Sequence, residues 1–307
     1  MFNKNSRNEV KTMTKTFGTY HPAVNFAFFT GAIGLSMFIS HPLFSLVSLI
    51  ISFSYYLTLS KGKSKKFLLW YMVMFIAVVF FNGVMNTMGN TVLFIWLKNR
   101  PVTFEALFYG AVTGVNFISV MLWFSCYNII MTTDKFTYLF GRFAPSVTLV
   151  LSMILRLIPN LIKKTKTIIG ARSCIGKGTK GDTYKDKLNS GLEVLSILTS
   201  CALEDAVITA DSMRSRGYVD DIHTSYHTYK KQMRDIVVAA LFAVTAVAVI
   251  VCIFTGCTAM QFLPIIIFPK TTVFTYVGII SYALFLSIPI IIEFSEEITW
   301  HILKSKI

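Results

Sequence analysis

Charged residues are scarce in this chain of 307 residues. Asp, Glu, Lys and Arg together make up 14% of it, whereas a soluble domain carries about 25%. The mean hydropathy is +0.62, and the hydrophobic residues, 54% of the total, gather in long uninterrupted runs. Such a chain is short of surface for water, so the composition excludes an ordinary soluble protein.

Motifs for metal, redox or nucleotide chemistry are lacking as well. The five cysteines form no CxxC pair and demand no oxidising compartment. His223 and His227 lie four residues apart without an HExxH pattern, which favours a surface segment over a metal site. The segment 176–181 matches GxGxxG, but it follows a predicted helix instead of a strand, and the spacing before Lys177 does not fit a P-loop. We therefore expect no cofactor, no resident metal and no ATP site in this chain.

Although charged residues are few, most of them are positive, and the formal net charge is +14. A nucleic-acid-binding protein would spread its Lys and Arg over a soluble face. Here they stand between aromatic-rich stretches that carry no charge. We expect the lipid bilayer, and no nucleic acid, as the partner of these stretches.

Six hydrophobic runs approach the length of about 20 residues that a membrane crossing needs. The polar N-terminal segment has no small-residue cleavage site after a short apolar core, so we expect no removable signal peptide. The run 92–97 is too short to cross, and we expect it to form an interfacial helix anchored by Trp96. The predicted spans are 23–40, 42–60, 67–86, 106–131, 236–256 and 272–293.

The basic residues are distributed unevenly between these spans. Only three of the 29 Lys and Arg residues, Lys98, Arg100 and Lys270, lie in the connections 87–105 and 257–271. The other connections and the two termini hold the remaining 26. Since Lys and Arg are enriched on the cytoplasmic side of a membrane, this bias predicts six spans with both termini in the cytoplasm.

The connection between the fourth and fifth spans is about a hundred residues long and is patterned. Unstructured connections of this length are rare and usually functional. Over 147–169 and 188–213 apolar residues recur at intervals of three and four, which predicts two amphipathic helices of about 25 residues each. We thus expect an all-α membrane protein with about six transmembrane helices. Its domains are N-terminal transmembrane helices (1–131), a cytoplasmic domain with long amphipathic helices (132–235) and C-terminal transmembrane helices (236–307).

The two amphipathic helices are expected to end alike. The first finishes at 170–173 (Gly-Ala-Arg-Ser) and the second at 215–218 (Ser-Arg-Gly-Tyr). Gly217 can adopt the left-handed conformation that terminates a helix, and a cation is favoured beside the negative helix end. Ordinary capping explains either end by itself. The small neighbours also leave each guanidinium protruding, so it can make forked hydrogen bonds to a carboxylate or carbonyl group.

With these ends, the sequence resembles the T component of energy-coupling factor (ECF) transporters, a transmembrane subunit also found in cobalt and nickel importers. The resemblance covers most of the chain in layout. Its specific motifs are 156–159 (Arg-Leu-Ile-Pro), Ala171-Arg172-Ser173 and above all 210–218 (Ala-Asp-Ser-Met-Arg-Ser-Arg-Gly-Tyr). The first end reads Ala-Arg-Ser where the family often has Ala-Arg-Gly.

The resemblance implies the coupling subunit of an ATP-dependent importer of a vitamin or a metal ion, in the plasma membrane of a prokaryote. In that family, two Arg-tipped helices dock onto two cytoplasmic ATP-binding subunits and bear a separate substrate-binding membrane subunit, so the T component is not itself an enzyme. The implied ATPase-docking residues are Ala171, Arg172, Ser173, Ser215, Arg216 and Gly217. The implied platform for the substrate-binding subunit is formed by Leu188, Leu192, Leu195, Ala202, Ala206 and Met213.

Two other classes remain as alternatives. A secondary carrier or channel without ATPase partners usually needs ionisable groups near the middle of its spans, and none is visible. A membrane-embedded enzyme would need a catalytic cluster of His, Asp or Glu within the spans, which is also missing. The transported substrate is not predicted, because in the resembling family another polypeptide selects it.

Overall fold

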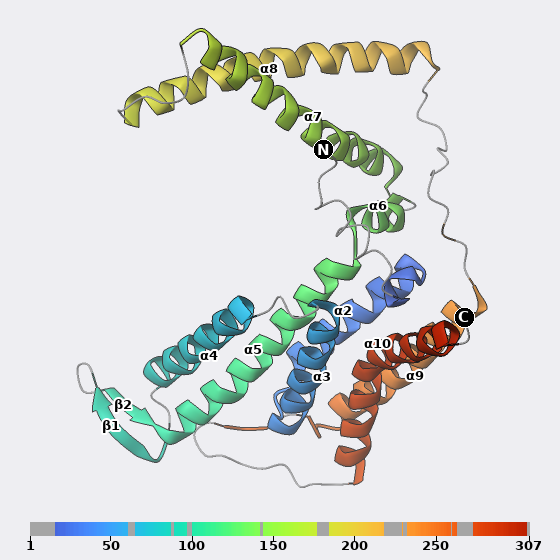
Figure 1. The fold of residues 1–307 in the computed structure, drawn as a ribbon. Helices are drawn as coiled ribbons and strands as arrows, with labels where there is room; N and C mark the ends of the chain where they lie inside the picture. Colours follow the sequence, from blue (N-terminus) through green and yellow to red (C-terminus); the bar gives the residue numbers. More distant parts are fainter. Residues whose placement is uncertain are drawn as a thin grey trace. The chain divides into compact units, whose positions relative to one another are not determined.

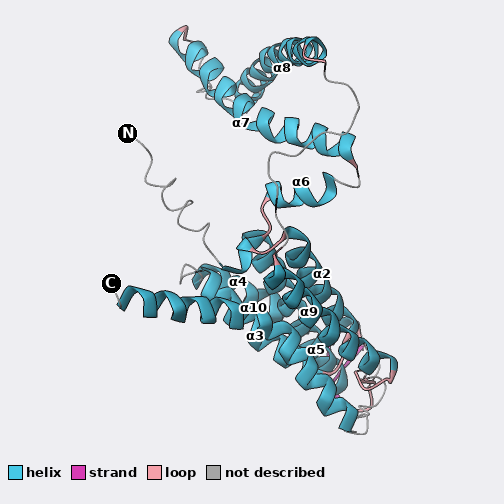
Figure 2. Ribbon diagram, turned by 90° about the vertical axis from the view of Figure 1, so that its right-hand side faces the viewer, coloured by secondary structure: helices cyan, strands magenta, loops and turns pink. Residues whose placement is uncertain are grey.

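The computed structural model describes residues 16–60, 65–86, 89–96, 100–141, 144–176, 184–217, 229, 232–258, 260–262 and 273–305. Most of the GxGxxG segment and the histidines at 223 and 227 lie outside these residues. The chain divides into two compact units, Met1–Thr132 with Tyr229–Ile307 and Thr133–Thr228. Helices make up nearly all of the described chain (Figure 2), which confirms the expected all-α class.

The described part of the first unit is a bundle of six α-helices, and these overlap the six predicted runs (Figure 1). Helix α5 packs against the three helices before it, and α10 packs against α3 and α9. Proline begins two of the helices, where its missing N–H group costs no hydrogen bond. The helices are α2 (Pro22–Phe38), α3 (Pro42–Ser60), α4 (Lys65–Met85), α5 (Phe104–Ile130), α9 (Met233–Phe254) and α10 (Val273–Ser305).

Five described helices are long and apolar enough to cross a membrane. Four of them, α3, α5, α9 and α10, belong to the first unit, and the fifth is most of α7 (Pro145–Cys174) in the second. Helix α2 and the apolar part of α4, Leu69–Met85, are shorter. These lengths support a multi-pass membrane protein, while the six crossings and their orientation stay predictions.

Aromatic rings form the centre of the first unit. The Phe28 ring of α2 lies with its centroid 4.8 Å from that of Phe242 on α9 and 5.4 Å from that of Phe285 on α10. The Trp123 ring of α5 has its centroid 5.6 Å from that of Phe28. Phe17, in the short 3-10 helix Thr16–Thr19, contacts Phe28 edge-on, with the ring centroids 5.6 Å apart. Because such ring pairs add to the energy of area burial, this cluster stabilises the packing of four helices at one place.

A network of hydroxyl groups joins four helices within the same bundle. Ser36 of α2 lies with its Oγ 2.9 Å from the Tyr282 hydroxyl of α10. Ser48 of α3 and Ser119 of α5 share a hydrogen bond of 2.5 Å, and the Trp123 indole N–H donates to Ser48 Oγ at 3.4 Å. Membrane helices use such small polar side chains to hold one another, because lipid offers no hydrophobic drive for association.

Helices α4 and α5 approach closely at two glycines of α5. A Cβ atom added at Gly110 would lie 3.2 Å from the Val79 carbonyl oxygen and 3.0 Å from Asn82 Cβ. One added at Gly114 would lie 2.9 Å from the Phe75 ring. The spacing Gly-x-x-x-Gly lets two backbones come together in a membrane, so this motif sets the distance between α4 and α5.

The connection after α4 differs from the expectation. Residues Val92–Trp96 form strand β1, which pairs antiparallel with strand β2 (Arg100–Thr103), so the predicted interfacial helix is wrong. A helix of six residues is too short to be stable, whereas Val, Ile, Phe and Trp favour a strand when a second strand follows closely. Beside the hairpin, Glu105 at the start of α5 accepts a hydrogen bond from Thr91 Oγ1 at 2.8 Å.

The start of α9 is tied to the N-terminal segment. The Gln232 backbone N–H donates to Asp235 Oδ2 at 3.0 Å, one half of a capping box. The Arg234 guanidinium carbon lies 5.1 Å from the centroid of the Tyr20 ring, a cation–π contact. Burial raises the pKa of the Tyr20 hydroxyl above its ordinary value. These contacts hold the chain where it re-enters the bundle after the second unit.

The second unit contains α6 (Thr133–Gly141), α7 and α8 (Tyr184–Ser215) in its described part. Helix α7 has 30 residues and α8 has 32, so both exceed the predicted length. At 1.5 Å per residue they are about 45 and 48 Å long. Helix α7 packs against both α6 and α8.

Candidate functional site

Helix α8 ends as its sequence predicts. The helix finishes at Ser215, and Gly217 follows with a φ angle of +69°, the left-handed conformation that glycine tolerates best. The Gly217 N–H donates to the Arg214 carbonyl oxygen at 3.1 Å, and the Arg216 N–H donates to that of Ser212 at 3.2 Å. These bonds satisfy the last carbonyl groups and fix where Arg216 leaves the helix.

Arg216 is exposed at this end, and so are its neighbours Ser215 and Gly217. Two ion pairs connect side chains among the described residues, and neither includes Arg216. The exposed guanidinium thus belongs to a residue directly after the negative end of the α8 dipole. Its five N–H donors suit a planar, forked contact with a carboxylate of another protein.

Helix α7 ends later than expected. It continues through Ala171 and Ser173 to Cys174, and the residue with a left-handed φ angle is Gly176, at +78°. Gly170 stays helical and has open space around it. The segment Ala-Arg-Ser-Cys contains no Gly or Pro that would break a helix, so the chain turns only at the next glycine. The motif therefore occupies the last turn of α7 and not the turn beyond it.

Arg172 does not protrude from this last turn, and the expectation that it would is wrong. Its Nη2 atom lies 2.5 Å from Glu193 Oε2 on α8, and its side chain is only 11% exposed. Ala171 and Ser173 on either side are exposed. The sequence places Glu193 on the polar back of α8, and only the crossing of the two helices brings it to Arg172. The two arginines thus have different surroundings, and the docking role of each stays a prediction.

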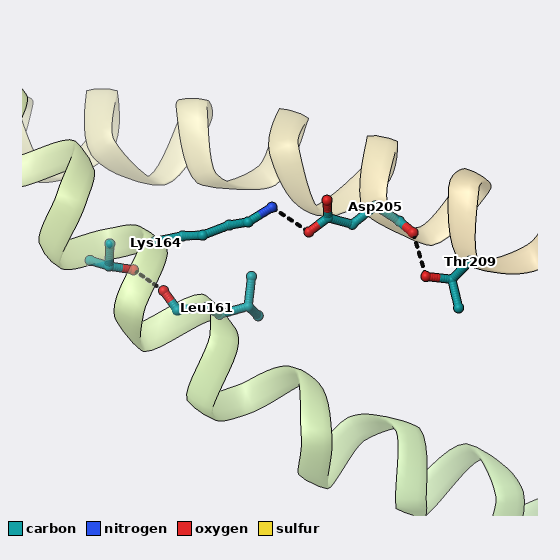
Figure 3. Close-up of polar contacts among 5 residues, drawn as sticks. Leu161, Lys164, Asp205 and Thr209 are labelled. Carbon is teal, nitrogen blue, oxygen red and sulfur yellow. Dashed lines mark hydrogen bonds and ion pairs between the residues drawn. The ribbon is translucent and has the colours of Figure 1, made fainter.

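A second ion pair connects the same two helices. Figure 3 shows Lys164 reaching from α7 to the carboxylate of Asp205 on α8. The Thr209 hydroxyl donates to the Asp205 backbone carbonyl one turn further along α8, at 2.7 Å (Figure 3). Each charged side chain of the pair is about one third exposed, so the contact is partly open to water and salt. Together the two ion pairs connect α7 and α8 at separate points along α8.

The side of α8 that carries Asp205 packs on α7, and the predicted platform lies mostly off that side. Val194 is the buried residue of α8. Leu188, Leu192 and Leu195 are each 56% exposed. Ala206 is exposed as well, whereas Ala202 and Met213 are partly buried. The apolar stripe is therefore largely uncovered.

Sequence reasoning missed further members of this uncovered surface. On α8 the exposed side chains of Leu203 and Val207 extend the stripe, and the helical period could have included them. Helix α7 exposes an apolar row of its own, made by Val147, Val150, Ile154, Ile158 and Ile162. Soluble monomers rarely expose continuous apolar surfaces of this extent, so these faces mark contact with a protein or a membrane.

Among the described residues, no three His, Cys, Asp or Glu side chains lie together where they could hold a metal ion. The described residues of the second unit offer ion pairs and exposed apolar side chains. Both are means of binding other macromolecules.

Comparison with known families agrees with this organisation. A model of the cobalt transport protein family CbiQ matches residues 5–226, which include α2 to α5 and both α7 and α8. No curated protein matches the chain. The match confirms the family resemblance of the sequence and identifies the chain as a membrane component of a transporter. Such a component works with other transporter subunits and is not a typical enzyme. The chain belongs to the CbiQ cobalt transport protein family, which is the family of transmembrane T components of ECF transporters.

Proposed function

We propose that this chain is the coupling subunit of an ATP-dependent importer in the plasma membrane of a prokaryote. Two cytoplasmic ATP-binding subunits would supply the energy, and a separate membrane subunit would bind the substrate, a metal ion or a vitamin. The family's name favours cobalt. The observation that carries the proposal is the pair of long helices α7 and α8, whose apolar faces are largely uncovered and whose C-terminal ends carry an arginine each. Arg172 lies in the last turn of α7, and Arg216 directly follows α8.

The charge distribution supports a cytoplasmic position for α7 and α8, although α7 is apolar enough to cross a membrane. Arg156 lies inside the apolar first part of α7, and three lysines, Lys163, Lys164 and Lys166, follow that part directly. A crossing by this part would carry the guanidinium of Arg156 into lipid at high cost. A crossing by α7 would also reverse the orientation of every later segment. The basic residues of α8 and of the C-terminus would then lie outside the cell, against the positive-inside rule.

The geometry of α7 and α8 suits the transmission of movement. The two helices are about 45 and 48 Å long along the chain, α7 with Pro159 inside it, and the ion pairs of Arg172 with Glu193 and of Lys164 with Asp205 connect them. A displacement applied at the helix ends by the ATP-binding subunits would move both helices together. The uncovered leucines of α8 would pass this movement to the substrate-binding subunit, which would tilt and release its cargo.

The docking assignment is tested by charge reversal at the helix ends. We expect Arg172→Glu combined with Arg216→Glu to remove the two ATP-binding subunits from the purified complex and to abolish uptake, because each new carboxylate would repel the acidic pocket that receives the arginine. Lys187→Glu is the matched control, since it makes the same charge change at an exposed position near the start of α8.

The measurement is co-purification together with uptake in vesicles, after the membrane subunit has been shown to stay folded. Loss of the ATP-binding subunits in the double variant, and not in the control, supports the coupling role. If complex and uptake both survive the double variant, the arginines are only helix caps. A carrier or channel without ATPase partners then becomes the better assignment.

A further inference from the structure

The two arginines that the proposed function assigns to docking are not equivalent. Arg216 is exposed and takes part in neither ion pair of the described residues. Arg172 is 11% exposed, and its guanidinium contacts the carboxylate of Glu193. An ATP-binding subunit can therefore reach Arg216 directly, whereas at Arg172 it meets a guanidinium that is already engaged.

We propose that Glu193 competes with the ATP-binding subunit for Arg172, so that docking at the end of α7 exchanges one carboxylate partner for another. This inference rests on the proposed function. Glu193 acts through Arg172 and is a positioning residue: it holds the guanidinium against α8 until a second carboxylate replaces it. The subunit that binds Arg216 needs no such exchange, so the α8 end docks first and the α7 end second.

The surroundings of the pair make this exchange feasible. The Glu193 side chain is 60% exposed, so its carboxylate returns to water when Arg172 leaves, and no unpaired charge remains buried. The Arg172 Nη2 atom lies 2.5 Å from Glu193 Oε2, and a guanidinium can engage a carboxylate through two parallel N–H groups. A pocket that encloses the guanidinium and offers the forked arrangement would therefore compete with the largely exposed carboxylate of Glu193.

The second ion pair keeps the two helices together during the exchange. Lys164 and Asp205 lie away from the helix ends and form their own contact. Arg172 can therefore change partners without separating α7 from α8. The small, exposed residues Ala171 and Ser173 leave space beside the guanidinium for an incoming side chain.

The test measures how tightly the purified pair of ATP-binding subunits from the same genome binds the full chain in nanodiscs. We expect Glu193→Gln to bind about two- to fivefold more tightly than the wild type, the gain that removal of a partly exposed competing ion pair provides. Asp205→Asn is the matched control, because it breaks the other α7–α8 ion pair and leaves Arg172 paired; its affinity should stay at the wild-type value. In an Arg172→Ala background, Glu193→Gln should have no effect.

Unchanged or weaker binding of Glu193→Gln would overturn the inference, and so would a gain that persists without Arg172 or that Asp205→Asn reproduces. A second measurement needs no ATP-binding subunit: phenylglyoxal modification of Arg172, followed by mass spectrometry, should be faster in Glu193→Gln than in the wild type. If Arg172 becomes more reactive but no form of the chain binds the ATP-binding subunits, the proposed function fails while the shielding by Glu193 stands. If the subunits bind the wild type but the reactivity does not change, only the inference fails.

Discussion

The close approach of α4 and α5 gives a prediction whose size follows from the structure. Replacing Gly110 by alanine puts a Cβ atom 3.0 Å from Asn82 Cβ, 3.2 Å from the Val79 carbonyl oxygen and 3.3 Å from Val79 Cα. Two of these neighbours are backbone atoms of α4, which cannot turn aside. The helices must therefore separate by a few tenths of an ångström, and overpacking of this kind costs about 1–3 kcal/mol.

Gly34 provides the control, because it lies in α2 and an added Cβ atom would meet nothing within 4 Å. Both alanine variants gain the same helix propensity, about 0.5–1 kcal/mol over glycine. The propensity cancels in the difference between them, so Gly110→Ala should be about 1–3 kcal/mol less stable than Gly34→Ala. Gly114→Ala should fall between the two, because its nearest neighbour is the Phe75 ring, which can rotate.

Stability can be measured in mixed micelles as the free energy of unfolding by increasing SDS fraction, with tryptophan fluorescence as the signal. Equal stability of Gly110→Ala and Gly34→Ala would refute the reasoning. It would mean that α4 and α5 move apart at no cost, and that the Gly-x-x-x-Gly motif does not set their distance.

Two further predictions concern the platform and the hydroxyl network. Leu192→Asp places a charge on the uncovered stripe of α8. It should reduce co-purification of the substrate-binding subunit at least tenfold while the ATP-binding subunits remain bound. Loss of both kinds of subunit together would contradict a separate platform. For Ser48 and Ser119, which share a hydrogen bond, a double-mutant cycle with alanine should give a coupling energy of about 0.6 kcal/mol, the average for hydrogen bonds between membrane helices. A coupling energy of zero would show that the hydrogen bond between Ser48 and Ser119 contributes nothing to stability.

The different environments of the two arginines bear on how a coupling subunit is assembled. If both ends of the helix pair offered equal sites, the two ATP-binding subunits would bind in either order. If the two arginines dock these subunits as proposed, the contact of Arg172 with Glu193 makes the two sites unequal within a single chain. An ordered assembly then needs no difference between the ATP-binding subunits themselves.

The amino-acid sequence determined those properties of the protein that depend on local pattern. Long apolar runs with few charges predict helices at the positions where α2 to α5, α9 and α10 are found, because a run of this length in lipid must satisfy its backbone hydrogen bonds internally. Spacings of three and four residues likewise identified α7 and α8. The end of α8 at Gly217 was predictable, since a glycine after the last turn is the usual residue for a left-handed cap.

Only the tertiary structure decided the features that depend on which segments meet. The β1–β2 hairpin was missed because the stability of Val92–Trp96 as a strand comes from pairing with Arg100–Thr103, and a short apolar run does not reveal its partner. The pairing of Arg172 with Glu193 depends on where two long helices cross. That crossing places Arg172 against a carboxylate, whereas Arg216 is exposed. The sequence could not predict this difference, because periodicity along a helix defines its faces but not the helix that will cover each face.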